Sequence, residues 1–76
     1  MLELYQFEEC PYCQKVRSML SELELDFICR NVSRNREERT MVKLISGQEG
    51  VPVLVDSANK KVVVDSAKII EYLQTR

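Results

Sequence analysis

The pattern of apolar and polar residues at the start of the chain predicts a β-strand followed directly by a helix. Residues 2–7 begin with leucines at alternate positions and continue with two aromatic residues, and this strand ends at Glu8 and Glu9. Further along, four apolar residues recur at the i, i+3, i+4 and i+7 positions that make one stripe on a helix. They are Val16, Met19, Leu20 and Leu23.

Pro11 predicts where this helix begins. Proline is favoured at the first helical position, because the N–H group that it lacks would have no partner there. Cys10 therefore becomes the N-cap residue, and Cys13 becomes the third residue of the helix.

The middle of the chain predicts a second strand and a second helix. The strand covers Phe27, Ile28, Cys29 and Val32. Asn35, with Glu38 three residues later, resembles a capping box, and Gly47 is a typical stop for the helix that follows. The apolar residues expected on the buried side of this helix are Met41, Val42, Leu44 and Ile45.

The last third of the chain predicts a hairpin and a final helix. Valine-rich segments at 53–55 and 61–64 flank a polar loop, and Asp65 and Ser66 are both good N-cap residues. The expected buried face of this helix comprises Ala67, Ile69, Ile70 and Leu73. The element order is βαβαββα, which indicates an α/β domain with a mixed sheet.

Length and composition narrow the possible functions. The chain has 76 residues, enough for one domain over 1–76, and its 11 basic and 12 acidic residues give no reason to expect a nucleic-acid or membrane partner. The acidic, alternating N-terminus is not a signal peptide, and no apolar run is long enough to span a membrane. The chain has no histidine, which excludes serine-histidine and cysteine-histidine catalysis.

Cysteine is the reactive side chain that remains. Cys10, Cys13 and Cys29 cannot all pair within one chain, so the sequence does not indicate the disulfide framework of a secreted protein. We therefore expect a cytoplasmic location. Residues three apart on a helix share a face, so the sulfurs of Cys10 and Cys13 are close enough to form a disulfide. The helix N-terminus favours the thiolate form of Cys10, which Glu8 and Glu9 oppose and Lys15 assists.

The cysteines allow two other interpretations. A zinc site needs four ligands, and only Cys29 is left to add to the pair, so no metal is expected. Cys29 itself is most simply a small buried apolar residue on its strand, with a regulatory thiol as the alternative.

Three segments together resemble a dithiol glutaredoxin. They are Cys10-Pro11-Tyr12-Cys13, Gly50-Val51-Pro52-Val53 and the stretch 65–73 that begins Asp65-Ser66-Ala67 and ends at Leu73. The same segments are similar to the N-terminal, glutathione-binding domain of glutathione transferases. The chain stops at Arg76, immediately after the third expected helix, which favours a free-standing glutaredoxin.

The resemblance implies a thioredoxin fold and a glutathione site. The expected sheet has four strands, with the second strand at one edge, then the first, the third and the fourth, and with helices on both faces. A cis peptide is implied before Pro52, which turns the Val51 backbone towards the cysteinyl part of glutathione. Asp65 and Ser66 are implied to hold the γ-glutamyl group, and Tyr12 to pack along the ligand.

The chain departs from the family in two places. Many glutaredoxins carry a lysine three residues before the first cysteine, where this chain has Phe7, so Arg36 or Arg39 would have to supply the missing cation. The alternative for these arginines is a solvated helix start. The residues 62–66 before the last helix are also closer to the transferases than to dithiol glutaredoxins.

The predicted function is reduction of disulfides and glutathione mixed disulfides by a monomer with glutathione as co-substrate. Cys10 is the expected nucleophile and Cys13 the resolving thiol. Three alternatives stay open: a glutathione-liganded [2Fe-2S] protein, a redoxin reduced by thioredoxin reductase, and a glutathione-transferase-like module.

Overall fold

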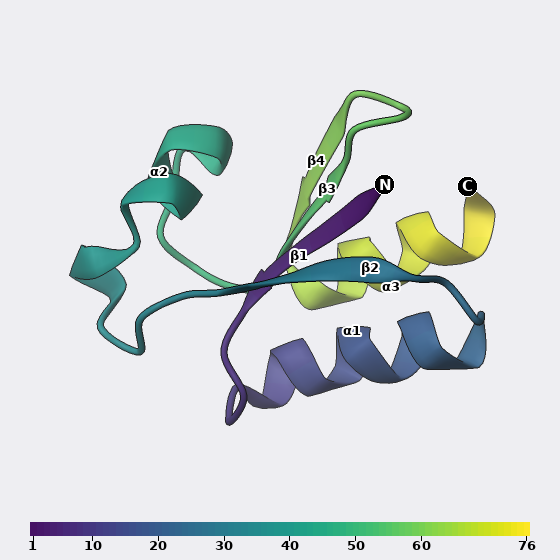
Figure 1. The fold of residues 1–76 in the computed structure, drawn as a ribbon, viewed down its shortest axis with the longest axis horizontal. Helices are drawn as coiled ribbons and strands as arrows, with labels where there is room; N and C mark the ends of the chain where they lie inside the picture. The colour runs from purple at the N-terminus through teal and green to yellow at the C-terminus, as the bar shows by residue number, and fades with distance from the viewer.

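The computed structural model describes residues 1–76 as a single sheet with helices on both of its faces (Figure 1). The predicted order of elements is confirmed. Along the chain the elements are β1 (Leu2–Gln6), α1 (Pro11–Glu22), β2 (Phe27–Asn31), the 3-10 turn η1 (Arg36–Glu38), α2 (Thr40–Ser46), β3 (Val53–Asp56), β4 (Lys61–Val64) and α3 (Ser66–Thr75). The longest helix has 12 residues, and none of the helices is long and apolar enough to cross a bilayer.

The strand order is β2-β1-β3-β4, as the resemblance implied. β1 runs parallel to β2 and antiparallel to β3, and β3 and β4 form the antiparallel hairpin. In the register, Leu4 lies between Cys29 of β2 and Leu54 of β3. β1 is therefore an inner strand. The loop that follows it begins between the neighbouring strands β2 and β3, not at an edge of the sheet.

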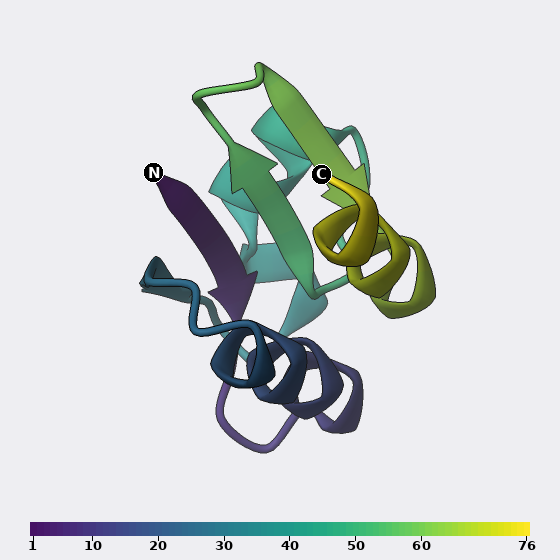
Figure 2. The same ribbon diagram turned by 90° about the vertical axis from the view of Figure 1, so that its right-hand side faces the viewer.

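The main core lies between the sheet and the helix pair α1 and α3, which Figure 2 shows side by side on one face. Alternation along β1 turns Leu2 and Leu4 to this face, where they meet Val16 and Leu20 of the predicted α1 stripe. Met19 is partly buried against this core, and Leu23 is the C-cap of α1 and 40% exposed, which corrects the prediction for Leu23. The buried cluster comprises Leu2, Leu4, Val16, Leu20, Leu54, Ile69 and Leu73. Of the expected α3 face, Ile69 and Leu73 are buried, Ile70 is partly buried and Ala67 is exposed, which corrects the prediction for Ala67.

The opposite face of the sheet carries only the short helix α2, and here the sequence prediction was partly wrong. Val42 is buried and Ile45 partly buried, whereas Met41 is 52% exposed and Leu44 is 77% exposed. A helix of seven residues makes about two turns, so only a narrow part of its surface can face the sheet.

The predicted start of the second helix is also corrected. Asn35 accepts a hydrogen bond from the Glu37 N–H, but it caps the 3-10 turn η1 rather than α2. Glu38 accepts a bond from Ser33 instead of completing a capping box. Arg39 then leaves helical geometry, with φ −87° and ψ 61°, and α2 begins at Thr40. Its end at Gly47 is confirmed, because Gly47 adopts the left-handed conformation with φ 74° that glycine tolerates.

Candidate active site

The two cysteines of the CPYC segment lie at the N-terminus of α1, where the sequence predicted them. Cys10 is the N-cap, and its Sγ accepts a hydrogen bond from the Cys13 N–H at 3.2 Å. Pro11 is the first helical residue, and Cys10 is 5% exposed while Cys13 is fully buried. Both are free thiols. The Cys10 sulfur therefore lies beside a backbone N–H group at the positive end of the helix dipole.

Cys13 has the opposite electrostatic setting. Burial raises the pKa of the Cys13 thiol to about 12, and the hydrogen bond with Cys10 acts in the same direction. A backbone hydrogen bond with Phe7 and the charge of Arg17 lower it in part. Cys13 is therefore a protonated thiol at neutral pH.

The two glutamates before Cys10 are each paired with an arginine. The Arg17 guanidinium lies 3.9 Å from the Glu8 carboxylate and donates to the Glu8 carbonyl at 3.2 Å. Arg34 forms an ion pair with Glu9, and this hydrogen bond lowers the pKa of the Glu9 carboxyl group. The negative charge that the sequence places beside Cys10 is thus largely balanced. Lys15 lies over the Tyr12 ring, 5.4 Å from its centre.

Phe7, at the position where the resemblance to glutaredoxins implies a lysine, is flanked by two guanidinium groups. Arg34 and Arg39 lie 5.8 Å and 5.3 Å from the centre of its ring. Arg39 is only 6% exposed, and it donates to the carbonyls of Ser33 at 2.7 Å, Glu49 at 2.9 Å and Arg34 at 3.2 Å. The guanidinium of Arg39 is therefore used within the protein, and Arg39 is not a solvated residue at a helix start.

Arg36 differs from Arg39 in that its side chain makes no ion pair or hydrogen bond with the protein. It is exposed on η1 and lies beside Gly50, where its Nη2 would be 3.9 Å from an added Cβ atom. Of the two arginines considered from the sequence, Arg36 is the one free to meet a ligand.

A cleft of about 380 Å³ opens beside the dithiol helix, and it collects all five of the predicted glutathione-binding residues. Tyr12 comes from the CPYC segment and is 58% exposed, Val51 and Pro52 come from the loop before β3, and Asp65 and Ser66 come from the start of α3. The remaining lining residues, which the sequence did not single out, are Gln48, Gly50 and Val64. Cys10 and Cys13 do not line the cleft themselves.

The backbone around this cleft matches the sequence expectations. The Val51–Pro52 peptide bond is cis. Asp65 is the N-cap of α3 and accepts a hydrogen bond from the Lys68 N–H at 3.3 Å, and Ser66 is the first helical residue. Asp65 has φ 75° and ψ 124°, a conformation that non-glycine residues rarely adopt and that is concentrated at functional sites.

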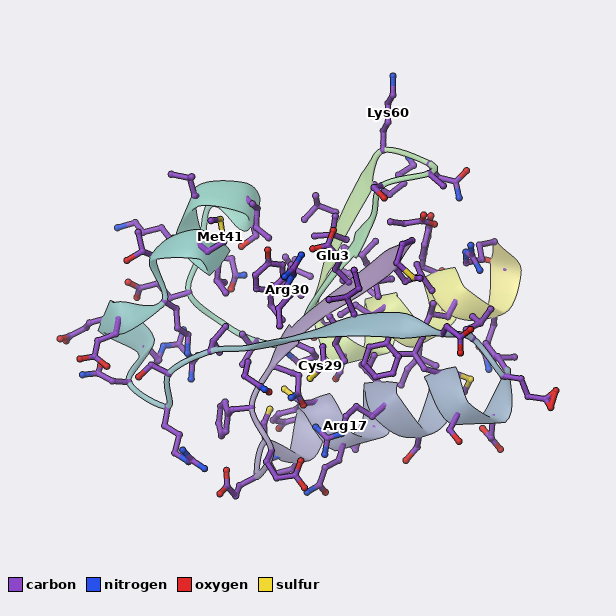
Figure 3. All side chains as sticks on the ribbon, in the orientation of Figure 1. Glu3, Arg17, Cys29, Arg30, Met41 and Lys60 are labelled. Carbon is purple, nitrogen blue, oxygen red and sulfur yellow. The ribbon has the colours of Figure 1, made fainter.

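The third cysteine is not buried, which corrects the expectation for Cys29. It lies on the edge strand β2, its side chain is exposed, and its Sγ accepts a hydrogen bond from Gln6 Nε2 at 3.0 Å. Figure 3 shows Cys29 with Arg17 on the α1 side of β2, and Glu3, Arg30 and Met41 on the other side. Because β2 has a neighbour on one side only, the small side chain of Cys29 in the middle of this strand stays open to solvent. No group of three or more cysteine, aspartate or glutamate side chains is gathered to hold a metal ion.

Comparison with known proteins gives the family. Residues 4–76 match the family model described as the N-terminal domain of glutathione S-transferase. The chain belongs to this family. It is also 31% identical over 74 residues to an uncharacterized glutaredoxin-like 8.6 kDa protein in the rubredoxin operon of Clostridium pasteurianum, of which it covers 99%. The chain is thus a glutaredoxin-like member of the glutathione S-transferase N-terminal domain family.

Larger relatives contain the same domain as one part of their chain. The sequence is 37% identical over 76 residues to mouse (Mus musculus) prostaglandin E synthase 2 and spans 19% of that protein. Glutaredoxin 2 of Salmonella typhimurium, solved with glutathione, superposes with a TM-score of 0.86 at 20% identity over 99% of this chain and 33% of its own. A glutathione S-transferase of Methylobacillus flagellatus with bound glutathione gives 0.82 at 27% identity, covering 100% and 37%. The family fold, the thioredoxin fold, is therefore that of this chain.

Proposed function

We propose that this protein is a glutathione-dependent thiol-disulfide oxidoreductase that reduces glutathione mixed disulfides and protein disulfides. The observation that carries the proposal is the cleft beside the dithiol helix, which brings Tyr12, Val51, Pro52, Asp65 and Ser66 together from three separate segments. Related proteins of this fold are described with glutathione bound. Two differences between the cysteines support exchange chemistry at this place: the Cys10 sulfur accepts an N–H bond at the helix N-terminus, and the pKa of the buried Cys13 thiol is raised.

The proposed reaction begins with the Cys10 thiolate. It attacks the glutathionyl sulfur of a mixed disulfide, a Cys10–glutathione disulfide forms, and the substrate sulfur leaves as a thiolate that takes up a proton. A second glutathione thiolate then attacks the glutathionyl sulfur, which releases oxidised glutathione and restores the Cys10 thiolate. With a protein disulfide, the Cys10 thiolate attacks one substrate sulfur and forms a mixed disulfide, and the other substrate sulfur leaves as a thiolate that takes up a proton. Cys13 then gives up its proton and attacks the sulfur of Cys10, which closes the Cys10–Cys13 disulfide and releases the reduced substrate. Two glutathione molecules reduce this disulfide back to the two thiols and leave as oxidised glutathione.

Each part of glutathione has a proposed partner in the cleft. The Val51 backbone pairs with the cysteinyl residue in a strand-like manner, and the Tyr12 ring packs along the ligand. The carboxylate of Asp65 receives the γ-glutamyl ammonium, and Ser66 at the helix N-terminus receives the γ-glutamyl carboxylate. Arg36 supplies the cation for the glycine carboxylate, because its guanidinium is unpaired beside Gly50. No metal takes part in this scheme.

The proposed setting follows from the chemistry. A protein that uses glutathione as reductant works where glutathione is kept reduced, and we propose the cytoplasm. The proposed partners are glutathione and disulfide-bonded or glutathionylated proteins. We propose that the protein acts on them as a monomer.

A second candidate is a glutathione-binding module of transferase type. The family match over residues 4–76 favours it, and the solved transferases contain this domain as 37% or less of their chains. Such a module would bind glutathione without needing Cys13. Conjugation of glutathione to an electrophile, unchanged by Cys13→Ser, would support this candidate over the exchange reaction.

Calorimetric titration with reduced glutathione tests the binding part of the proposal. The wild-type chain is compared with Asp65→Asn, which keeps an N-cap oxygen and tolerates the unusual backbone of this position but removes the charge. We expect Asp65→Asn to bind glutathione at least about tenfold more weakly, because one charge-assisted hydrogen bond is lost. Its melting temperature should stay near that of the wild type. Asp26→Ala, at an exposed aspartate far along the chain, is the matched control.

Two results would count against this site. Absence of heat at millimolar glutathione would point to a redoxin that thioredoxin reductase reduces, and a coupled assay with that reductant would then show turnover. Equal affinity of Asp65→Asn and wild type would remove Asp65 from the ligand and leave it as a helix cap only.

A further inference from the structure

The segment that leads into the cis-proline is held by two polar side chains whose role the sequence did not indicate. Gln48 uses both ends of its amide on Gly50: its Oε1 accepts from the Gly50 N–H at 2.6 Å, and its Nε2 donates to the Gly50 carbonyl at 3.0 Å. The same Nε2 lies 2.9 Å from Ser46 Oγ. Ser46 in turn donates to the Val42 carbonyl at 2.6 Å, so the loop is fastened to the end of α2.

Arg39 holds the neighbouring residue of the same loop. Its Nη1 donates to the Glu49 carbonyl at 2.9 Å, and its guanidinium group lies over the Phe7 ring, 5.3 Å from the ring centre. Phe7 lies three residues before Cys10, and the Cys10 N–H donates back to the Phe7 carbonyl at 3.3 Å. Arg39 therefore connects the loop that carries the dithiol with the loop that carries Val51 and Pro52. It has no carboxylate partner, so its charge is held by carbonyls and an aromatic face alone.

We propose that Gln48 and Arg39 are the positioning residues of the glutathione cleft. They hold Gly50 and Glu49, the two residues before Val51, and so fix the Val51 backbone against the dithiol loop. This inference rests on the proposed function, since it concerns the edge that would pair with glutathione. Neither residue exchanges a proton or electron. Their contribution is to keep the Val51 N–H and carbonyl in place before the ligand arrives, which lowers the ordering cost of binding.

Gly50 provides an independent way to disturb this arrangement. A Cβ atom added to Gly50 would lie 2.7 Å from Gln48 Oε1, closer than such atoms approach in proteins. Gly50→Ala therefore pushes the Gln48 amide away without deleting it. If the Gln48 amide fixes the Val51 backbone, Gly50→Ala and Gln48→Leu lower the affinity for glutathione to the same extent.

The test measures glutathione affinity and turnover in the full chain. Gln48→Leu and Gly50→Ala are expected to raise both the Kd and the KM for glutathione about tenfold, the size expected for two lost hydrogen bonds. At saturating glutathione, kcat and the pH profile of turnover are expected to match wild type, because Cys10 and its helix N-terminus are untouched. Arg39→Met should raise KM in the same way, and Arg39→Lys should recover part of it.

Matched controls separate positioning from general loss of stability. Gln74→Leu removes an exposed glutamine from α3, and Arg30→Met removes an exposed arginine from the far side of β2; both are expected to leave KM unchanged. An unchanged KM in folded Gln48→Leu and Gly50→Ala, or a lower kcat at constant KM, would overturn the positioning role. A wild-type chain that neither binds glutathione nor turns over would overturn the proposed function together with this inference, whereas active wild type with indifferent variants overturns this inference alone.

Discussion

The two ends of the sheet each bury an ionisable side chain, and they treat it in opposite ways. Asp56 pairs in register with Leu2 at one end of β1, and it is 1% exposed. Cys13 follows the other end of β1 and is fully buried. The pKa of the Asp56 carboxyl is lowered to about 2, whereas that of the Cys13 thiol is raised to about 12.

The difference lies in the donors that surround each group. Asp56 accepts hydrogen bonds from Asn59 at 2.9 Å, from the Tyr72 hydroxyl at 2.7 Å and from Arg76 at 3.3 Å, so its charged form is favoured despite burial. Burial is the main cause that raises the pKa of the Cys13 thiol, and the hydrogen bond with Cys10 adds to it, so the neutral form is favoured. Hydrogen bonds therefore outweigh burial at Asp56, whereas at Cys13 burial prevails. At one end the charged Asp56 joins α3 to the hairpin, and at the other end Cys13 stays a neutral, buried thiol.

The largest effect expected from this comparison is on thiol reactivity. Because the pKa of Cys13 is far above that of an ordinary thiol, we expect iodoacetamide to modify Cys13 about a hundredfold more slowly than the exposed Cys29 in the folded, reduced protein at mildly alkaline pH. Peptide mass spectrometry over a time course measures both rates. In denaturant the two rates should converge, and equal rates in the folded protein would show that Cys13 is not protected.

At the other end, Asp56→Ala should strongly destabilise the fold. The substitution leaves the Tyr72 hydroxyl, Asn59 and Arg76 without their common acceptor, which costs about 3 kcal/mol. For a domain of this size that corresponds to a fall in melting temperature of roughly 10–25 °C. Thermal unfolding followed by circular dichroism measures it, with Asp26→Ala as the exposed control. A shift of only a few degrees would mean that the Asp56 network does not hold the two elements together.

The same carboxylate predicts the acid limb of the stability curve. The folded-state pKa of Asp56 is below its ordinary value of 3.8, so its stabilisation is complete above that pH and is lost as the pH falls towards 2. The loss is on the order of 2 kcal/mol. Urea unfolding at several acidic pH values measures this slope. Asp56→Asn should flatten it, and an unaltered slope in that variant would assign acid unfolding to other groups.

The smallest effects are expected on the sparsely covered face of the sheet. Leu44 is 77% exposed, so Leu44→Ser should change the free energy of unfolding by less than about 0.5 kcal/mol. Val42 is fully buried on the same helix, and Val42→Ala should cost about 1–2 kcal/mol through lost apolar contacts. Chemical denaturation of the two variants compares them directly. A larger loss for Leu44→Ser would restore the wider buried face predicted from the sequence.

The features that were predictable from the sequence depend on local rules. Pro11 defines the start of α1 and so places Cys10 and Cys13, and alternation along β1 and the spacing of Val16 and Leu20 define the core face. The strand order, the cis bond before Pro52 and the grouping of Asp65 with Tyr12 came from resemblance to a family, because no local pattern determines which segments meet.

The features that were missed depend on long-range contacts. Cys29 is exposed because β2 is an edge strand, and Leu44 is exposed because α2 is too short to cover the sheet. In the sequence, Arg39 looks like one of several surface arginines in a polar stretch. In the folded chain its side chain is buried and donates to the carbonyls of Ser33 and Glu49, which only folding brings together.

The central claim is that Cys10 carries the exchange reaction and Cys13 only resolves it. Turnover of a small glutathione mixed disulfide by the wild type, Cys10→Ser, Cys13→Ser and the control Cys29→Ser tests it most directly. We predict that Cys10→Ser has no activity above background, while Cys13→Ser and Cys29→Ser retain turnover, because the Cys10–glutathione disulfide is resolved by a second glutathione. Turnover retained in Cys10→Ser would contradict the account.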